Sequence, residues 1–164
     1  MNEALVIDGY NLLYALKKQA RLSPVDLEHA RVQMLDQLIN FAAYQDKRII
    51  VVFDGRGTGS LERHQSVEVV YTRDNQTADS YIEMLIPELI RDHRVTVVTS
   101  DYEEQKNVFG SGALRYSSRE FALFLEESKK NERRHYTDRT GQAGHLDRRL
   151  DASLWRILEK RRRE

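Results

Sequence analysis

Acidic residues stand directly behind the short apolar stretches of this sequence. Asp8 and Asp54 each follow one at once, and Asp101 follows a third after a single serine. The stretches span residues 4–7, 49–53 and 95–99, and each has the length of a buried strand rather than a helix. Since ligands of open α/β sheets bind beyond the carboxyl ends of the strands, we expect the three carboxylates to lie at one edge of a parallel sheet. A single Asp would be weaker evidence, because Asp and Gly are also ordinary turn residues.

Two further acids open a predicted helix between the second and third of these stretches. Thr77 can cap a helix that begins at Ala78, and Asp79 and Glu83 follow four residues apart. Residues at this spacing lie on one helix face, so both carboxylates can point toward the same site. The simpler interpretation is that acids favour helix amino termini, where they offset the helix dipole.

Carboxylates gathered without histidine or cysteine ligands suit a hard divalent cation such as Mg²⁺ or Mn²⁺. The chain contains no cysteine, which excludes a thiolate ligand and a cysteine nucleophile. A cation held in this way activates a water molecule and stabilises charge on a phosphodiester. We therefore expect a metal site built from acids of this set: Asp8, Asp54, Asp79, Glu83 and Asp101.

The charges of the chain are unevenly divided, although they sum to zero. Residues 1–128 carry 14 Lys and Arg against 20 Asp and Glu, whereas residues 129–164 carry 12 against 6. An acidic body followed by a basic segment indicates a polyanionic partner such as RNA, although a solvated surface helix would have the same composition. The basic residues expected to contact RNA are Lys129, Lys130, Arg133, Arg134, Arg139, Arg161, Arg162 and Arg163.

Strands and helices alternate along the sequence. Apolar runs predict strands over residues 4–7, 49–53, 67–71, 95–99 and 113–116. Helices are expected to begin near Leu12, at Pro24 behind a Ser23 cap, at Ala78 and after Ser117 or Ser118, with two more over residues 102–109 and 146–158. Pro87 should kink or split the helix that contains it. This order predicts a three-layer α/β/α sandwich with a mostly parallel central sheet.

The length of 164 residues fits one domain with its own core. We expect residues 1–128 to form this domain, and residues 129–164 to form a basic helical segment packed on it. No apolar run approaches the ~20 residues of a membrane span, and Glu3 and Asp8 interrupt the amino terminus where a signal peptide would be apolar. With no cysteine to form disulfides, a cytoplasmic protein is the expectation.

Four motifs resemble the YacP-like group of NYN domains, which belongs to the wider PIN-like nuclease fold. The motifs are VIDGYNL at residues 6–12, VFDG at 52–55, TADSYIE at 77–83 and VTSD at 98–101, and they occur in the order found in the family. The resemblance spans about residues 4–125. It implies a metal-dependent ribonuclease, expected to be an endonuclease, on a small parallel sheet.

The resemblance also implies roles for individual residues. Asp8, Asp79 and Asp101 match the metal-binding acids of the family most directly, and Asn11 matches its recurrent asparagine. The acids that match less directly are Asp54 and Glu83. Asn11 is expected to orient Asp8 or a bound water, although it could instead serve only as a helix cap. YacP-like proteins are linked to the translation machinery, so the ribosome is an expected partner and messenger RNA the expected substrate.

Three functions are considered for these residues. The first is an endoribonuclease that leaves 5′-phosphate and 3′-hydroxyl ends. The second is an RNA- or ribosome-binding module on a nuclease-like scaffold, since fold does not establish chemistry. The acids disfavour this function, because carboxylates that face phosphate would not help a protein that only binds RNA. The third is a receiver domain phosphorylated on Asp54. Only helices are expected between Asp8 and the strand that ends at Asp54, with no second strand, which disfavours this function. No lysine follows the later strands at the position where a receiver domain needs one.

Overall fold

The computed structural model describes residues 2–17, 23–55, 57–100 and 111–138. The chain divides into two units, residues 1–128 and residues 129–164. The first unit holds the whole sheet and the helices packed on it. Of the second unit, the structure describes the helical residues 129–138.

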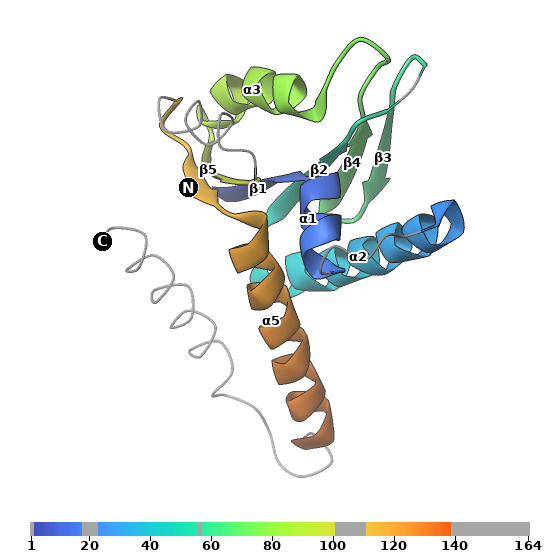
Figure 1. Ribbon diagram of the computed structural model, residues 1–164. Coiled ribbons are helices and arrows are strands. Elements are labelled where there is room, and N and C mark those ends of the chain that lie inside the picture. Colours follow the sequence, from blue (N-terminus) through green and yellow to red (C-terminus); the bar gives the residue numbers. More distant parts are fainter. Residues whose placement is uncertain (1, 18–22, 56, 101–110, 139–164) are drawn as a thin grey trace. The chain divides into compact units, whose positions relative to one another are not determined.

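Six strands of the first unit form one sheet in the order β3-β4-β2-β1-β5-β6 (Figure 1). The strands are β1 (Asn2–Asp8), β2 (Arg48–Phe53), β3 (Ser60–His64), β4 (Val67–Tyr71), β5 (His93–Val98) and β6 (Leu114–Tyr116). Neighbouring strands run parallel except for β3, which is antiparallel to β4. The predicted, mostly parallel sheet is confirmed.

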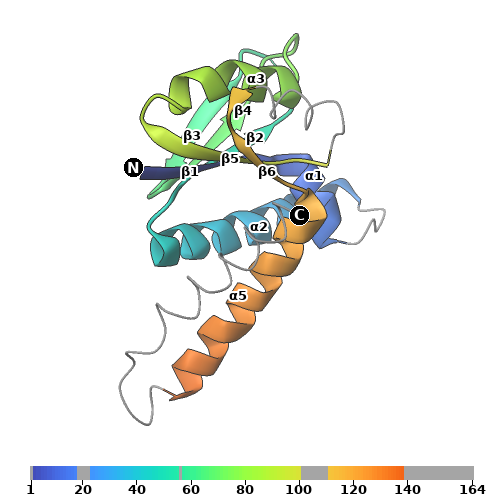
Figure 2. The ribbon, with the colours of Figure 1, turned by 90° about the vertical axis from the view of Figure 1, so that its left-hand side faces the viewer.

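Helices cover both faces of this sheet, as Figure 2 shows for α3 (Ala78–Leu89) on one side and α2 (Pro24–Gln45) on the other. The other helices among the described residues are α1 (Gly9–Leu16), which lies on the α2 side against β2, and α5 (Ser118–Asp138). The first turns of α5 also pack on α2, because the rings of Phe121 and Phe124 meet Phe41 edge to face at 5.8 and 5.5 Å. The three-layer α/β/α sandwich is therefore confirmed.

The inner strands are apolar on both faces because helices cover both faces. Side chains alternate along a strand, and Val6 of β1 and Val52 of β2 point toward α3, where they pack against Ile82 and Ile86. The same alternation carries Asp8, two residues beyond Val6, to the α3 side of the sheet. The core thus fixes the side on which this carboxylate emerges.

Three helices start where the sequence predicts. The hydroxyl of Ser23 accepts a hydrogen bond from the Asp26 amide, and the hydroxyl of Thr77 accepts one from the Ser80 amide. For α5 the cap is Ser117 rather than Ser118. Its hydroxyl accepts from the amide of Glu120, whose carboxylate accepts from the amide of Ser117. This reciprocal pair satisfies two donors that a helix start leaves without partners.

Three features of the fold differ from the sequence-based expectation. Helix α1 begins at Gly9 rather than near Leu12, because its cap is Asp8. Helix α3 continues through Pro87 to Leu89, because a proline this near the carboxyl end disturbs only the last turn. Strand β3 was not predicted, since its five residues are all exposed and show no apolar alternation. The helices expected over residues 102–109 and 146–158 lie outside the described residues. None of the helices that the structure describes has the length and hydropathy to cross a bilayer.

Candidate active site

Asp8 ends β1 and also caps α1. Its Oδ1 accepts a hydrogen bond from the Asn11 amide at 3.2 Å, and its Oδ2 accepts one from the Asn11 side-chain Nδ2 at 3.0 Å. The cap of α1 is therefore Asp8, and the interpretation of Asn11 as only a helix cap is wrong. Because only 7% of Asp8 is exposed, its carboxylate is held in a fixed orientation at the carboxyl edge of the sheet.

The turn from β1 into α1 depends on Gly9. A Cβ atom at this position would lie 2.5 Å from the ring of Phe53, which belongs to the neighbouring strand. Real Cβ atoms essentially never approach another atom so closely, so a larger residue would push α1 away from β2. Glycine lets the chain turn tightly against the ring and keeps Asp8 at the end of its strand.

A hydrogen bond from Asn11 connects this turn to the end of β5. The side-chain Nδ2 of Asn11 donates to the hydroxyl of Thr99 at 3.3 Å as well as to Asp8. Thr99 is fully buried, and its amide donates to the carbonyl of Tyr116 in β6. Thr99 was not predicted as a site residue. The available signal was its place at the end of an apolar run, two residues before Asp101.

Asp54 secures the helix that carries Asp79. Its Oδ1 accepts a hydrogen bond of 2.7 Å from the amide of Ala78, the first residue of α3. The loops behind β2 and β4 are also joined, since the Thr72 hydroxyl accepts from the Gly55 amide and donates to the Gln76 carbonyl. A Cβ on Gly55 would lie 2.1 Å from the Thr72 carbonyl oxygen, so these loops need a glycine to come this close.

The three acids Asp8, Asp54 and Asp79 act on one another. The pKa of Asp8 is raised from 3.8 to about 6, mainly by burial. The negative charges of Asp79 and Asp54, and the Asp79 side chain as a hydrogen-bond partner, contribute to this rise, and the Asn11 amide opposes it. Like charges held close disfavour ionisation, so this edge of the sheet favours a cation or a proton.

The remaining predicted metal ligands are Glu83 and Asp101. Glu83 is exposed one turn beyond Asp79 on α3, and the charges that raise the pKa of Asp8 are those of Asp79 and Asp54. Asp101 lies outside the described residues. Over the described residues alone, no group of three or more His, Cys, Asp or Glu could hold a metal ion. The bond from Asp54 to Ala78 gives a physical reason, since it commits one oxygen of that carboxylate to α3.

The donor set nevertheless fits a hard cation. Mg²⁺ is usually held by one or two carboxylates together with waters and substrate phosphate, and needs no complete protein cage. The paired carboxyls of Asp8 and Asp79 are such a set, with amide and hydroxyl groups of Asn11 and Thr99 behind them. The raised pKa of Asp8 also fits, because a bound cation would offset both causes of the rise, the burial of the carboxylate and the repulsion from its neighbouring acids.

Comparison with known proteins places the chain in a family. The family model of the YacP-like NYN domain matches residues 5–163. The chain belongs to the YacP-like NYN domain family. One relative is the uncharacterized protein YacP of Bacillus subtilis (strain 168), which is 35% identical over 167 residues covering 98% of this chain and 97% of that protein. The resemblance of the four motifs is thus confirmed, and the match extends beyond them into the basic segment.

Solved structures of this YacP-like NYN family share the fold. A crystal structure of Rae1 (YacP) from Bacillus subtilis is similar at a TM-score of 0.72 and 33% identity, covering 99% of this chain and 95% of that chain. A mutant of the same protein is similar at a TM-score of 0.73 and 33% identity, covering 88% and 87%. The family indicates a nuclease-like fold.

Of the basic residues expected to contact RNA, four lie in the part of this YacP-like chain that the structure describes and four lie outside it. Lys129, Lys130, Arg133 and Arg134 are exposed on the last turns of α5. Their spacing of four residues places Lys129 near Arg133 and Lys130 near Arg134 on the helix surface. The others, Arg139 and Arg161 to Arg163, lie outside the described residues.

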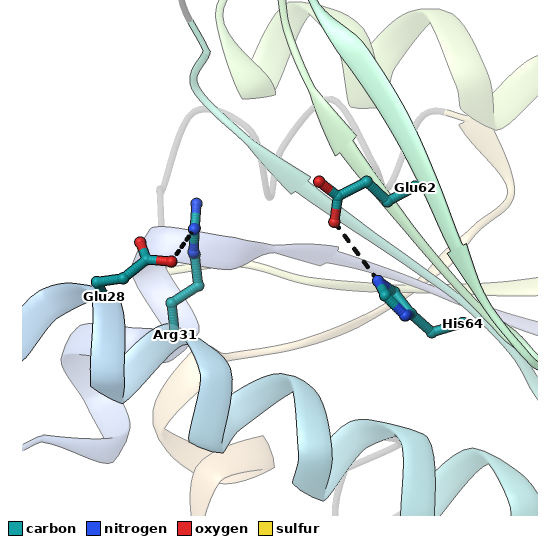
Figure 3. A network of polar contacts seen from close by, with 4 residues as sticks. All are labelled: Glu28, Arg31, Glu62 and His64. Atoms are coloured by element: carbon teal, nitrogen blue, oxygen red, sulfur yellow. Dashed lines mark hydrogen bonds and ion pairs between the residues drawn. The ribbon is translucent and has the colours of Figure 1, made fainter.

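Aromatic rings extend from the site across the α1 side of the sheet. Tyr10 meets Phe53 edge to face at 5.0 Å and stacks on Tyr14 at 6.3 Å. Phe53 stacks in turn on Tyr71 at 5.6 Å, and the guanidinium of Arg31 lies over the Tyr71 ring at 5.3 Å. Figure 3 shows Arg31 paired with Glu28 on α2, and His64 paired with Glu62 on β3. The His64 Nε2 and Glu62 Oε2 atoms are 3.4 Å apart.

Proposed function

We propose that this chain is an endoribonuclease dependent on Mg²⁺ or Mn²⁺, which hydrolyses RNA phosphodiester bonds and leaves 5′-phosphate and 3′-hydroxyl ends. The observation that carries the proposal is the group of interacting carboxylates at the carboxyl edge of the sheet, in which burial and two neighbouring acids raise the pKa of Asp8 to about 6. Such a group strains the protein unless it serves a cation. Membership of a nuclease-like family supports the same reaction class.

In this proposal the acidic residues have different roles. Asp8, Asp79 and Asp101 would hold the cation, with Asp54 and Glu83 contributing charge from the same edge of the sheet. Once bound, the cation lowers the pKa of a water molecule and stabilises the negative charge that develops on phosphate. Attack of water oxygen on phosphorus forms one P–O bond while the bond to the 3′ oxygen breaks, and that oxygen takes up a proton.

Asn11 would act as a positioning residue in this site. It donates to both Asp8 and Thr99, so it fixes the rotation of the Asp8 carboxylate relative to the end of β5. Groups that orient a metal ligand in this way are typically worth ~10–100-fold in affinity or activity. The buried Thr99 hydroxyl would in turn hold the Asn11 amide in the required orientation.

The proposed substrate is messenger RNA, cut in the cytoplasm in association with the ribosome. The motifs support this target, since YacP-like proteins are linked to the translation machinery. The basic segment also supports it, because clustered Lys and Arg bind the phosphate backbone of any RNA. In this proposal residues 129–164 form a basic segment that serves the nuclease domain of residues 1–128.

A second candidate is an RNA- or ribosome-binding module with little catalytic activity. The observation that favours it is the engagement of Asp54 with Ala78, which leaves two paired carboxyls among the described acids. Fold alone does not decide between binding and catalysis. The two candidates differ in what Asp79→Asn does, because this change removes a metal ligand and leaves the basic residues in place.

The deciding experiment is an RNA cleavage assay with Mn²⁺ or Mg²⁺, run with and without ribosomes. We expect wild type to produce new 5′-phosphate ends and Asp79→Asn to produce none, while both proteins bind RNA. Transcriptome-wide mapping of 5′ ends with the two proteins would locate the sites in messenger RNA. Equal end patterns for the two proteins, with RNA binding retained, would establish the binding module instead.

A further inference from the structure

Helix α1 carries an aromatic and basic stripe that starts two residues after Asp8. Tyr10, Tyr14 and Lys17 follow one another at spacings of four and three residues, so they lie along one face of the helix. The helix begins directly behind its cap Asp8. Consecutive Cα atoms are 3.8 Å apart, so the Cα atoms of Asp8 and Tyr10 are at most ~7 Å apart.

We propose that Tyr10, Tyr14 and Lys17 form a track that holds unpaired nucleotides of the substrate strand next to the cleaved bond. The inference rests on the proposed nuclease function and adds the residues that position the RNA. In this arrangement a base stacks on the outer tyrosine ring, and the following phosphate lies near the lysine ammonium.

The geometry of the rings supports the stacking step. The edge-to-face contact with Phe53, at 5.0 Å and 74°, fixes the ring of Tyr10 against the fully buried end of β2. Tyr14 stacks on it at 6.3 Å with an interplanar angle of 26°. Yet 47% of Tyr14 is exposed, so this large ring offers π surface to the solvent. Base–aromatic stacking on such surfaces is favourable and tolerates any base.

Lys17 supplies the charge that a nucleic-acid track needs. It is the carboxyl-terminal cap of α1, and its Nζ donates to the Gln33 side chain of α2 at 3.1 Å. An ammonium has three donors, so this bond holds the group in place and leaves donors for a phosphate oxygen. Aromatic rings alternating with a cation are the usual means by which proteins bind single strands without sequence preference.

The competing explanation is that the two tyrosines only stabilise α1 as a helix pair. The two explanations differ in what the ring at position 14 must be. Stacking on a base needs an aromatic face, so Tyr14→Phe and Tyr14→Trp should keep RNA affinity, whereas Tyr14→Leu and Tyr14→Ala should lose it. A purely structural pair would affect folding and leave the affinity of the folded protein unchanged.

The test measures fluorescence anisotropy of a labelled single-stranded oligoribonucleotide with the full chain carrying Asp79→Asn, so that the RNA is not cut. We expect Tyr14→Ala and Tyr14→Leu to raise Kd about tenfold, with Tyr14→Phe and Tyr14→Trp within about twofold of the parent. The matched control is Tyr44→Ala. This tyrosine is 43% exposed near the end of α2, at the opposite edge of the sheet, and its replacement should leave Kd unchanged.

Two readouts separate stacking from charge. Lys17→Gln should lower the slope of log Kd against log salt by about 0.7, the value for one phosphate bound on a single strand, whereas the tyrosine variants should leave the slope unchanged. Photocrosslinking with 5-iodouridine in the same oligonucleotide should attach RNA to Tyr10 or Tyr14. Circular dichroism melts confirm that each variant is folded.

The outcomes also distinguish the track from the nuclease function. If wild type cleaves RNA with Mn²⁺ but Tyr14→Ala binds as tightly as its parent, the track is overturned and the nuclease function stands. A Tyr14→Leu protein that binds like the parent would also overturn it, because the ring would then be dispensable. If wild type cleaves no RNA under any condition, the proposed function fails and the track fails with it.

Discussion

At the scale of single residues, Asp8 has two opposite effects on the stability of the folded protein. As a helix cap it stabilises α1 through its bond with the Asn11 amide. As a buried carboxylate beside two other acids it destabilises the folded protein when ionised, which is why its pKa rises from 3.8 to about 6. A residue chosen only for capping would not be placed where burial opposes its charge.

The pKa of Asp8 leads to a prediction about stability and pH in the absence of metal. Between pH 4 and pH 6 the folded state binds this proton more tightly than the unfolded state. The unfolding free energy of wild type should therefore lose roughly 3 kcal/mol from this residue as pH rises through that window. Asp8→Asn cannot titrate, so its melting temperature relative to wild type should rise from pH 4 to pH 6 and then level off. Thermal melts in EDTA across this range measure the difference.

The same pair of proteins tests whether Asp8 binds metal. Mn²⁺ should raise the melting temperature of wild type, since it binds only the folded state; a hundredfold excess over Kd is worth roughly 2.7 kcal/mol. We expect Asp8→Asn to lose most of this gain and all cleavage. An Asp8→Asn protein that melts lower than wild type in EDTA at neutral pH, yet still responds fully to Mn²⁺, would make Asp8 a structural turn residue.

At the scale of elements, the amino terminus of α3 is the part that must be placed most accurately. Thr77 caps the helix, and the Asp54 carboxylate holds the Ala78 amide from the neighbouring loop. Through these bonds the end of β2 determines where Asp79 stands relative to Asp8. A shift of α3 would separate the two carboxyls without changing either residue.

Replacing Asp54 in two ways separates its bond to α3 from its charge. Asp54→Asn keeps an oxygen that can accept from the Ala78 amide, so it should melt close to wild type in EDTA. Asp54→Ala leaves that amide without its acceptor and should cost ~0.5–2 kcal/mol. We expect cleavage to fall in both variants, and further in the alanine protein. Equal melting temperatures for the two variants would show that the bond contributes nothing to stability. Full cleavage by Asp54→Asn would show that the charge of Asp54 has no part in the cation site.

Most of the strands and helices could be predicted from the sequence. The buried strands were predictable because helices on both faces keep positions such as Val6 apolar throughout, and the helix starts were predictable because hydroxyl caps are local chemistry. Strand β3 was not, since an exposed edge strand pairs through its backbone and needs no apolar pattern. The roles of Asp54 and Thr99 were missed for a similar reason. Their partners Ala78 and Asn11 are 24 and 88 residues away in the chain.

At the scale of the whole molecule, the acidic unit and the basic segment have different expected tasks. Asp and Glu outnumber Lys and Arg in the first, and Lys and Arg outnumber Asp and Glu in the second. In the proposed function the excess of acids in the first unit opposes RNA binding, so the basic segment supplies the charge that binds the phosphate backbone. Removing its charge should therefore weaken binding without altering the carboxylate group.

Replacing Arg161, Arg162 and Arg163 together by glutamine tests this division. We expect weaker RNA and ribosome binding, and a salt slope reduced by about 0.7 for each phosphate that the variant no longer binds. The Mn²⁺-dependent rise in melting temperature should stay as in wild type. Arg91→Gln, a charge change at an exposed residue of the first unit, serves as the control. Unchanged binding across a salt series would show that these three arginines have no part in RNA recognition.

The position of β1 has a consequence for the synthesis of the protein. Strand β1 is made before the other described strands of the sheet but lies inside it, between β2 and β5, and its residues Asn2 to Ile7 pair with residues His93 to Val98. At ~5–20 residues per second, roughly 5–20 s separate the two halves of this pairing. Asn11 likewise cannot form its hydrogen bond with Thr99 until that residue has been made. A nascent chain therefore carries Asp8 long before it can assemble the edge of the sheet at which that acid lies, and this edge forms only after most of the sheet has left the ribosome.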